Sequence, residues 1–133
     1  MKIKNIILSA VSLSAVIWTG CASHVISNTP TGATSSTSNM IYETGSLKTV
    51  ETVTQDRAHA ATLAAFKDLQ FGLVGDVMDG AQQKVSARTN TDKKVLVVLE
   101  KESDRITAIR VSVGAFGDEA MSLQVMNKIK SHL

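Results

Sequence analysis

The stretch that decides the fold is residues 84–113, which reads KVSARTNTDKKVLVVLEKESDRITAIRVSV. Two parts of it, 85–89 and 109–113, alternate between inward-facing and polar positions, as strands do in a sheet with one face toward water. Between them, Val95-Leu96-Val97-Val98-Leu99 is a continuous apolar run, which predicts a central strand covered on both faces. Polar turn residues separate the three segments. The stretch therefore predicts an antiparallel meander.

Helical periodicity flanks this meander on both sides. On the N-terminal side, Thr54 can cap a helix that runs to about Leu69 and has an inner face rich in alanine. On the C-terminal side, a second helix begins at the acidic pair 118–119 and carries two lysines near its end, in agreement with the helix dipole. The predicted inner faces comprise Ala58, Ala61, Thr62, Ala65, Phe66 and Leu69 in the first helix, and Ser122, Val125, Met126, Ile129 and Leu133 in the second.

Two further segments have the character of strands. Residues 42–50 predict one strand with a bend or bulge at Gly45, and the apolar positions in 71–75 precede a turn at Asp79-Gly80. The order of strand, helix, meander and helix predicts an α+β domain. The simplest architecture is an antiparallel twisted sheet of four to five strands with both helices packed on one face.

The N-terminus has the pattern of a secretory signal. Lys2 and Lys4 precede an uncharged apolar run, 6–18, which is too short for a comfortable membrane span. Gly20-Cys21 follows, and this junction resembles the lipobox of bacterial lipoproteins, in which the cysteine is diacylated and the peptide is cut before it. We therefore expect residues 1–20 to be a signal peptide and Cys21 to carry the lipid, which labelled palmitate would mark.

An ordinary signal cleavage is the alternative to lipidation. Trp18 stands where lipoboxes usually carry an aliphatic residue, and Gly20 with Ala22 forms the small-x-small pattern that a general signal peptidase accepts. If the cysteine is lipidated, Ala22 and Ser23 follow it without an aspartate. In the lipoproteins that this pattern resembles, it implies export to the outer membrane, so the anchored domain is expected to face the periplasm.

The composition changes again after the cysteine. Residues 22–39 are dominated by serine, threonine and asparagine, which cannot bury enough apolar surface to order themselves. We expect 21–39 to be the lipidated N-terminus and a flexible tether, and 40–133 to be a single α+β domain. Because Cys21 is the only cysteine, the domain is expected to be stabilised by packing without disulfides.

The charge balance argues against a nucleic-acid partner. The chain has 14 basic and 12 acidic residues, and loss of Lys2 and Lys4 with the signal peptide leaves 12 of each. A nucleic-acid surface needs clustered basic residues, usually with stacking aromatics, and the sequence has no such cluster.

Four short motifs follow one another along the domain: Tyr42-Glu43-Thr44-Gly45, the alanine-rich segment 60–69, the strand 109–114 and Gly117-Asp118. In this order they resemble a family of small Gram-negative lipoproteins that is catalogued as a domain of unknown function and includes virulence-associated members. The resemblance covers nearly the whole mature domain. It implies an α+β lipoprotein, with an internal apolar cavity in some members, and it implies no known reaction.

The sequence carries no motif for catalysis or metal binding. His24, His59 and His132 are widely separated and lack the spacing of zinc ligands. Asp76 and Asp79 lack the oxygen-rich loop that calcium needs, so we interpret them as turn residues. There is no Gly-x-Ser-x-Gly elbow and no phosphate-binding loop. We therefore expect no metal, no cofactor and no enzymatic activity.

Two classes of function remain open. The first is a non-catalytic envelope module, anchored to the membrane by its lipid, that binds either an envelope protein on the sheet or an apolar molecule inside the domain. The second is an enzyme with a site assembled from distant residues. An apolar ligand would lie between helices and sheet, whereas the alanine face of the first helix favours a dry, closed core. The residues predicted to line such a pocket are Phe66, Leu69, Val125, Met126 and Ile129.

Overall fold

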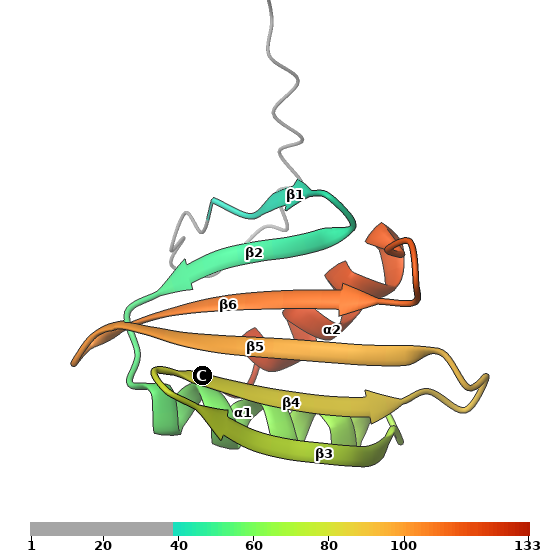
Figure 1. Ribbon diagram of the computed structural model, residues 1–133, viewed down its shortest axis with the longest axis horizontal. Coiled ribbons are helices and arrows are strands. Elements are labelled where there is room, and N and C mark those ends of the chain that lie inside the picture. Colours follow the sequence, from blue (N-terminus) through green and yellow to red (C-terminus); the bar gives the residue numbers. More distant parts are fainter. Residues whose placement is uncertain (1–38) are drawn as a thin grey trace, which may run out of the picture. The chain divides into compact units, whose positions relative to one another are not determined.

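The computed structural model describes residues 39–133, which form six strands and two helices (Figure 1). The strands are β1 (Ile41–Glu43), β2 (Ser46–Glu51), β3 (Gly72–Asp79), β4 (Gln82–Arg88), β5 (Lys94–Ser103) and β6 (Ile106–Val113). The helices are α1 (Gln55–Asp68) and α2 (Glu119–Lys130). No helix in this part of the chain is long and apolar enough to span a membrane.

All six strands form one antiparallel sheet in the order β1-β2-β6-β5-β4-β3. Both helices lie behind the sheet in Figure 1, so the predicted α+β class with two helices on one face is confirmed. Helix α2 packs on β2 and β6, whereas α1 packs on β4, β5 and β6 and also contacts α2. The helices thus form a continuous second layer.

The sheet has six strands where the sequence predicted four to five. The difference arises partly at 42–50, which we predicted to be one bent strand. Thr44 and Gly45 have φ angles of 48° and 75°, and this pair of left-handed residues makes a tight hairpin turn between β1 and β2. The bend expected at Gly45 is therefore a full reversal of the chain.

The core lies between the helices and one face of the sheet. Val95, Val97 and Leu99 of β5 are fully buried there, and Ala58 and Ala65 let α1 approach them closely. The other buried apolar side chains come from all parts of this layer: Leu47, Ala61, Phe66, Val85, Ala87, Ile109, Val111, Val113, Val125, Met126 and Ile129.

The prediction that β5 is covered on both faces is wrong. Leu96 and Val98 point to the face opposite the helices, here called the open face, and are only half buried. Val98 lies between Lys84 of β4 and Arg110 of β6 in the sheet register. The aliphatic stems of such long side chains shield an apolar neighbour while their charges stay in water, which explains an apolar strand without a covering layer.

Side-chain caps begin both helices. Thr54 accepts a hydrogen bond from the backbone N–H of Arg57 at 3.3 Å, as the sequence predicted. Asp118 is the cap of α2 and accepts from the backbone N–H of Met121 at 3.0 Å. This hydrogen bond and the ammonium group of Lys93, 3.0 Å away, hold the pKa of Asp118 below its ordinary value.

Candidate functional site

The two edges of the sheet differ in length and exposure. Strand β1 closes one edge with only three residues, whereas β3 forms the other edge with eight. Within residues 39–133, no strand pairs with the outer side of β3. An edge strand presents a row of unpaired backbone N–H and C=O groups, so β3 offers a long template for another strand.

Apolar side chains accompany this open backbone. The exposed fractions of Leu73, Val74, Val77 and Met78 are 55%, 64%, 59% and 54%. Proteins often protect a long edge with lysine, proline or a bulge; β3 has no lysine or proline, and its one bulge lies before residues 75–79. We call residues 72–79 with these four side chains the β3 edge, and their exposure is typical of a surface that binds a partner.

The local sequence divides β3 into an irregular and a regular part. A bulge interrupts the pairing with β4 between Leu73 and Gly75. From Gly75 to Asp79 the register with β4 is continuous, and a two-residue loop with Gly80 at φ 61° then reverses the chain. The regular part of the β3 edge is therefore the five residues 75–79.

Backbone hydrogen bonding alternates in direction along this regular part. Asp79 and Gln82 flank the two-residue loop. Such flanking residues exchange backbone hydrogen bonds with each other. Along an antiparallel ladder, these hydrogen-bonded pairs alternate with non-hydrogen-bonded pairs. Asp76 and Met78 lie in non-hydrogen-bonded pairs with β4. Their backbone N–H and C=O groups therefore point outward from the sheet, where a further strand would bind.

A polar network attaches β3 to the helix layer. His59 Nε2 of α1 lies 2.7 Å from Asp76 Oδ2, and Gln83 of β4 donates to the second carboxylate oxygen. Burial acts to raise the pKa of Asp76, but the hydrogen bonds from Gln83 and His59 and the charge of His59 lower it below its ordinary value. The network keeps this carboxylate ionised and holds the strand against α1.

The second carboxylate of β3 has a separate partner. Asp79 lies on the open face, and its carboxylate is 2.6 Å from the ammonium group of Lys84. The hydrogen bond and charge of Lys84 lower the pKa of Asp79. Asp76 and Asp79 therefore do not form a joint site, and no group of three or more His, Cys, Asp or Glu side chains gathers within residues 39–133. His132 likewise pairs with a single acid, Asp68, at 2.8 Å.

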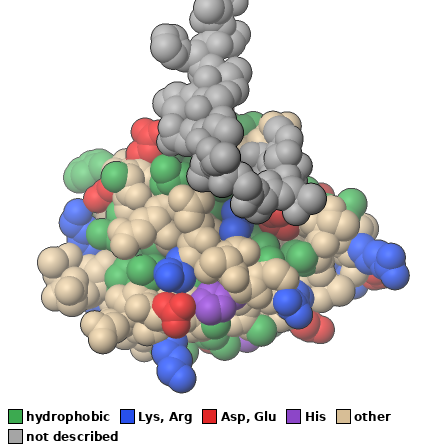
Figure 2. Space-filling model, turned by 180° about the vertical axis from the view of Figure 1, so that it is seen from behind, with side chains coloured by type: hydrophobic (Ala, Val, Ile, Leu, Met, Phe, Trp, Pro, Cys, Tyr) green, Lys and Arg blue, Asp and Glu red, His purple; other side chains and the backbone are tan. Residues whose placement is uncertain are grey.

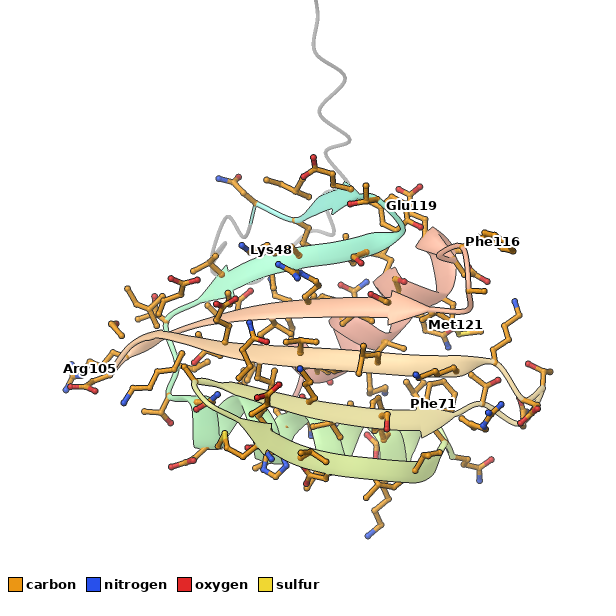
Figure 3. All side chains as sticks on the ribbon, in the orientation of Figure 1. Lys48, Phe71, Arg105, Phe116, Glu119 and Met121 are labelled. Atoms are coloured by element: carbon orange, nitrogen blue, oxygen red, sulfur yellow. The ribbon has the colours of Figure 1, made fainter. Side chains whose placement is uncertain are left out.

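Two of the short sequence motifs meet at the opposite edge. Gly45 in the β1–β2 turn and Gly117 before α2 pack backbone against backbone, and the Tyr42 hydroxyl lies over Gly117. We call these three residues the glycine clamp. Phe116 projects from the clamped loop in Figure 3, and its side chain is 97% exposed. The clamp thus holds the backbone of the loop from which this exposed aromatic side chain projects.

The five residues predicted to line an apolar pocket lie together in the core. Phe66, Val125, Met126 and Ile129 are buried, and Leu69 is partly buried against them. The structure has a shallow hollow elsewhere, on the outer face of α2, lined by Ala120, Leu123, Gln124, Asn127, Lys128 and Ser131. Binding of an apolar molecule by the five core residues stays a prediction. Cys21 and His24 lie outside the described residues.

Comparison with known proteins identifies a family. The family model described as "Protein of unknown function (DUF3568)" matches residues 2–132. The chain belongs to the DUF3568 family. No curated protein gives a significant match to it. The match extends through the N-terminal region as well as the folded domain.

Sequence reasoning missed the principal surface feature of this DUF3568 domain. We placed a strand near 71–75 but assigned no role to its edge. Val74, Val77 and Met78 are apolar residues in a segment without lysine or proline, but this pattern alone does not distinguish an edge strand from an inner one. Figure 2 shows that the helix side, by contrast, carries both signs of charge around its hydrophobic side chains, as an ordinary solvated surface does.

Proposed function

We propose that this DUF3568 protein is a lipid-anchored envelope protein whose folded domain binds another protein through the β3 edge and catalyses no reaction. The observation that carries the proposal is the eight-residue edge strand with four exposed apolar side chains. In this proposal the lipid is attached to Cys21, and the domain lies on the periplasmic side of the outer membrane. The resemblance to lipoproteins also implies an association with virulence.

The β3 edge suits recognition by strand addition. In this mode the backbone of an extended segment supplies affinity through ladder hydrogen bonds, and alternate side chains supply specificity. The outward backbone groups of Asp76 and Met78 provide the ladder. Val77 on the open face and Leu73 on the helix side are apolar and exposed, so they favour an incoming strand with apolar side chains on both faces.

Lipid attachment is tested by labelling. In cells grown with labelled palmitate, the wild-type protein is expected to carry the label, and Cys21→Ala is expected to abolish it, because the chain has no other thiol. The unlabelled variant should accumulate as precursor or appear as a soluble form. A wild-type mature protein that begins at Ser23 without lipid would show that ordinary cleavage occurs and that the anchor is wrong.

Protein binding at the β3 edge is tested by photocrosslinking in cells. A photoreactive residue at Val77 is expected to give a discrete protein adduct, because this exposed side chain lies at the centre of the regular edge. The matched control is the same residue at Lys101, which is exposed near the end of β5, two strands from β3 in the sheet order. If Val77 and Val74 give no adduct beyond that of Lys101, the β3 edge does not bind a protein.

A further inference from the structure

We propose that the partner at the β3 edge is a second copy of this chain, with the two β3 strands antiparallel about a two-fold axis at Val77. The proposal rests on the proposed binding role of the β3 edge and identifies its partner. The two sheets would join into one continuous sheet with both helix layers on the same side. Such an isologous contact closes on itself and gives a dimer.

The regular part of β3 selects the register. Residues 75–79 are free of the bulge, and Val77 is their centre. A two-fold axis at Val77 therefore pairs the largest number of regular residues. It places Val77 opposite Val77 of the second copy, Asp76 opposite Met78, and Gly75 opposite Asp79.

These pairs satisfy two requirements of an antiparallel ladder: paired side chains share a face, and paired backbone groups point toward each other. Gly75, Val77 and Asp79 share the open face, and Asp76 and Met78 share the helix side, so every pair has both side chains on one face. The outward backbone groups belong to Asp76 and Met78, which are each other's partners. A shift of the register by one residue would pair a side chain of the open face with one of the helix side.

Charge separates this register from its neighbours. An axis at Asp76 would place two carboxylates directly opposite each other, which is unfavourable. An axis at Met78 would bring the turn residue Gly80 into the ladder and shorten it. With the axis at Val77, no carboxylate faces another, and the contact between the two strands is apolar at its centre.

Charge also makes a second copy an acceptable partner. The β3 edge carries two acids, but Asp76 is paired with His59 and Asp79 with Lys84 in the same chain. Each carboxylate therefore has a hydrogen-bonding partner in its own chain, and in this register neither lies opposite a carboxylate of the second copy. Lipid anchoring would add to this effect, because confinement to one membrane raises the effective concentration of copies.

Disulfide trapping in the full-length protein tests the register. In membranes under mild oxidation, Val77→Cys is expected to form a covalent dimer, because facing residues in a non-hydrogen-bonded pair lie about 4.5 Å apart at Cα, within disulfide range. Wild type controls for Cys21, and Lys101→Cys controls for random collision. Asp76→Cys and Met78→Cys should each dimerise less than Val77→Cys. A stronger dimer from either would overturn the register.

A second variant tests the dimer without oxidation. Val77→Lys should remain folded, because this side chain is largely exposed, while two facing lysines should repel. The mass of the detergent-solubilised protein should fall from dimer to monomer, while its circular-dichroism spectrum stays that of the folded wild type. A monomeric wild type and no cysteine dimer would overturn the second copy as partner. If the Val77 photocrosslinker then traps a protein of another sequence, the proposed function stands; if it traps none, both fall.

Discussion

Replacing Gly117 with alanine is expected to lower the free energy of unfolding by about 2–5 kcal/mol, because a left-handed alanine costs about 1–2 kcal/mol and forced overlap with neighbouring backbone adds about 1–3 kcal/mol. A Cβ atom at this position would lie 2.3 Å from Gly45 Cα, 2.5 Å from Tyr42 Oη and 2.7 Å from the Gly45 carbonyl oxygen. Two of these three neighbours are backbone atoms. The variant must therefore separate the β1–β2 hairpin from the loop before α2.

Gly114→Ala is the matched control for this prediction. Gly114 has a φ of 74°, close to the 87° of Gly117, but a Cβ there would meet no atom within 4 Å. Its cost should be only the left-handed backbone penalty, about 1–2 kcal/mol. Urea unfolding of both variants measures the difference. Equal losses would show that backbone strain, and not the close approach in the glycine clamp, makes Gly117 necessary.

The glycine clamp explains why two weak motifs occur together in this sequence. Tyr42-Glu43-Thr44-Gly45 and Gly117-Asp118 are more than 70 residues apart in the chain, yet the structure packs them into one contact. Gly117 then leads directly into the cap residue Asp118. The same contact therefore sets the end of the β1–β2 hairpin, the start of α2 and the position of Phe116.

Local signals in the sequence predicted most of the fold. The period of 3.6 residues located α1 and α2, Thr54 and the acidic pair 118–119 located their starts, and alternation located β4 and β6. These features depend on neighbours within a few residues, which a sequence displays directly. The hairpin at Thr44 was missed because threonine rarely adopts a positive φ, so only Gly45 was recognised.

The candidate site was less predictable because it depends on strand order. An edge strand and an inner strand carry similar apolar residues, and Val77 looks no different in sequence from Val85, which is fully buried. Only the pairing of β3 with one neighbour makes its apolar residues accessible. The contact of His59 with Asp76 likewise joins residues 17 positions apart on a helix and a strand, and no local pattern specifies it.

Met126→Trp is expected to lower the free energy of unfolding by about 2–3 kcal/mol, because overpacking a closed core forces strained side chains and backbone shifts. Met126 is fully buried between α2 and the sheet, and its neighbours Val125 and Ile129 are equally inaccessible. Thermal and urea unfolding measure the loss. Met126→Leu, which nearly conserves volume, is the control and should cost less than about 1.5 kcal/mol.

The same variants decide whether the core residues bind an apolar molecule. In a dry core, neither wild type nor Met126→Leu should bind fatty acids or apolar fluorophores saturably, and the tryptophan should act through stability alone. A pocket among Phe66, Leu69, Val125, Met126 and Ile129 gives the opposite pattern. Wild type would then bind saturably, and tryptophan would block binding while leaving the unfolding temperature unchanged, because it would fill existing space. That outcome would make the interior, and not the β3 edge, the principal binding site of the domain.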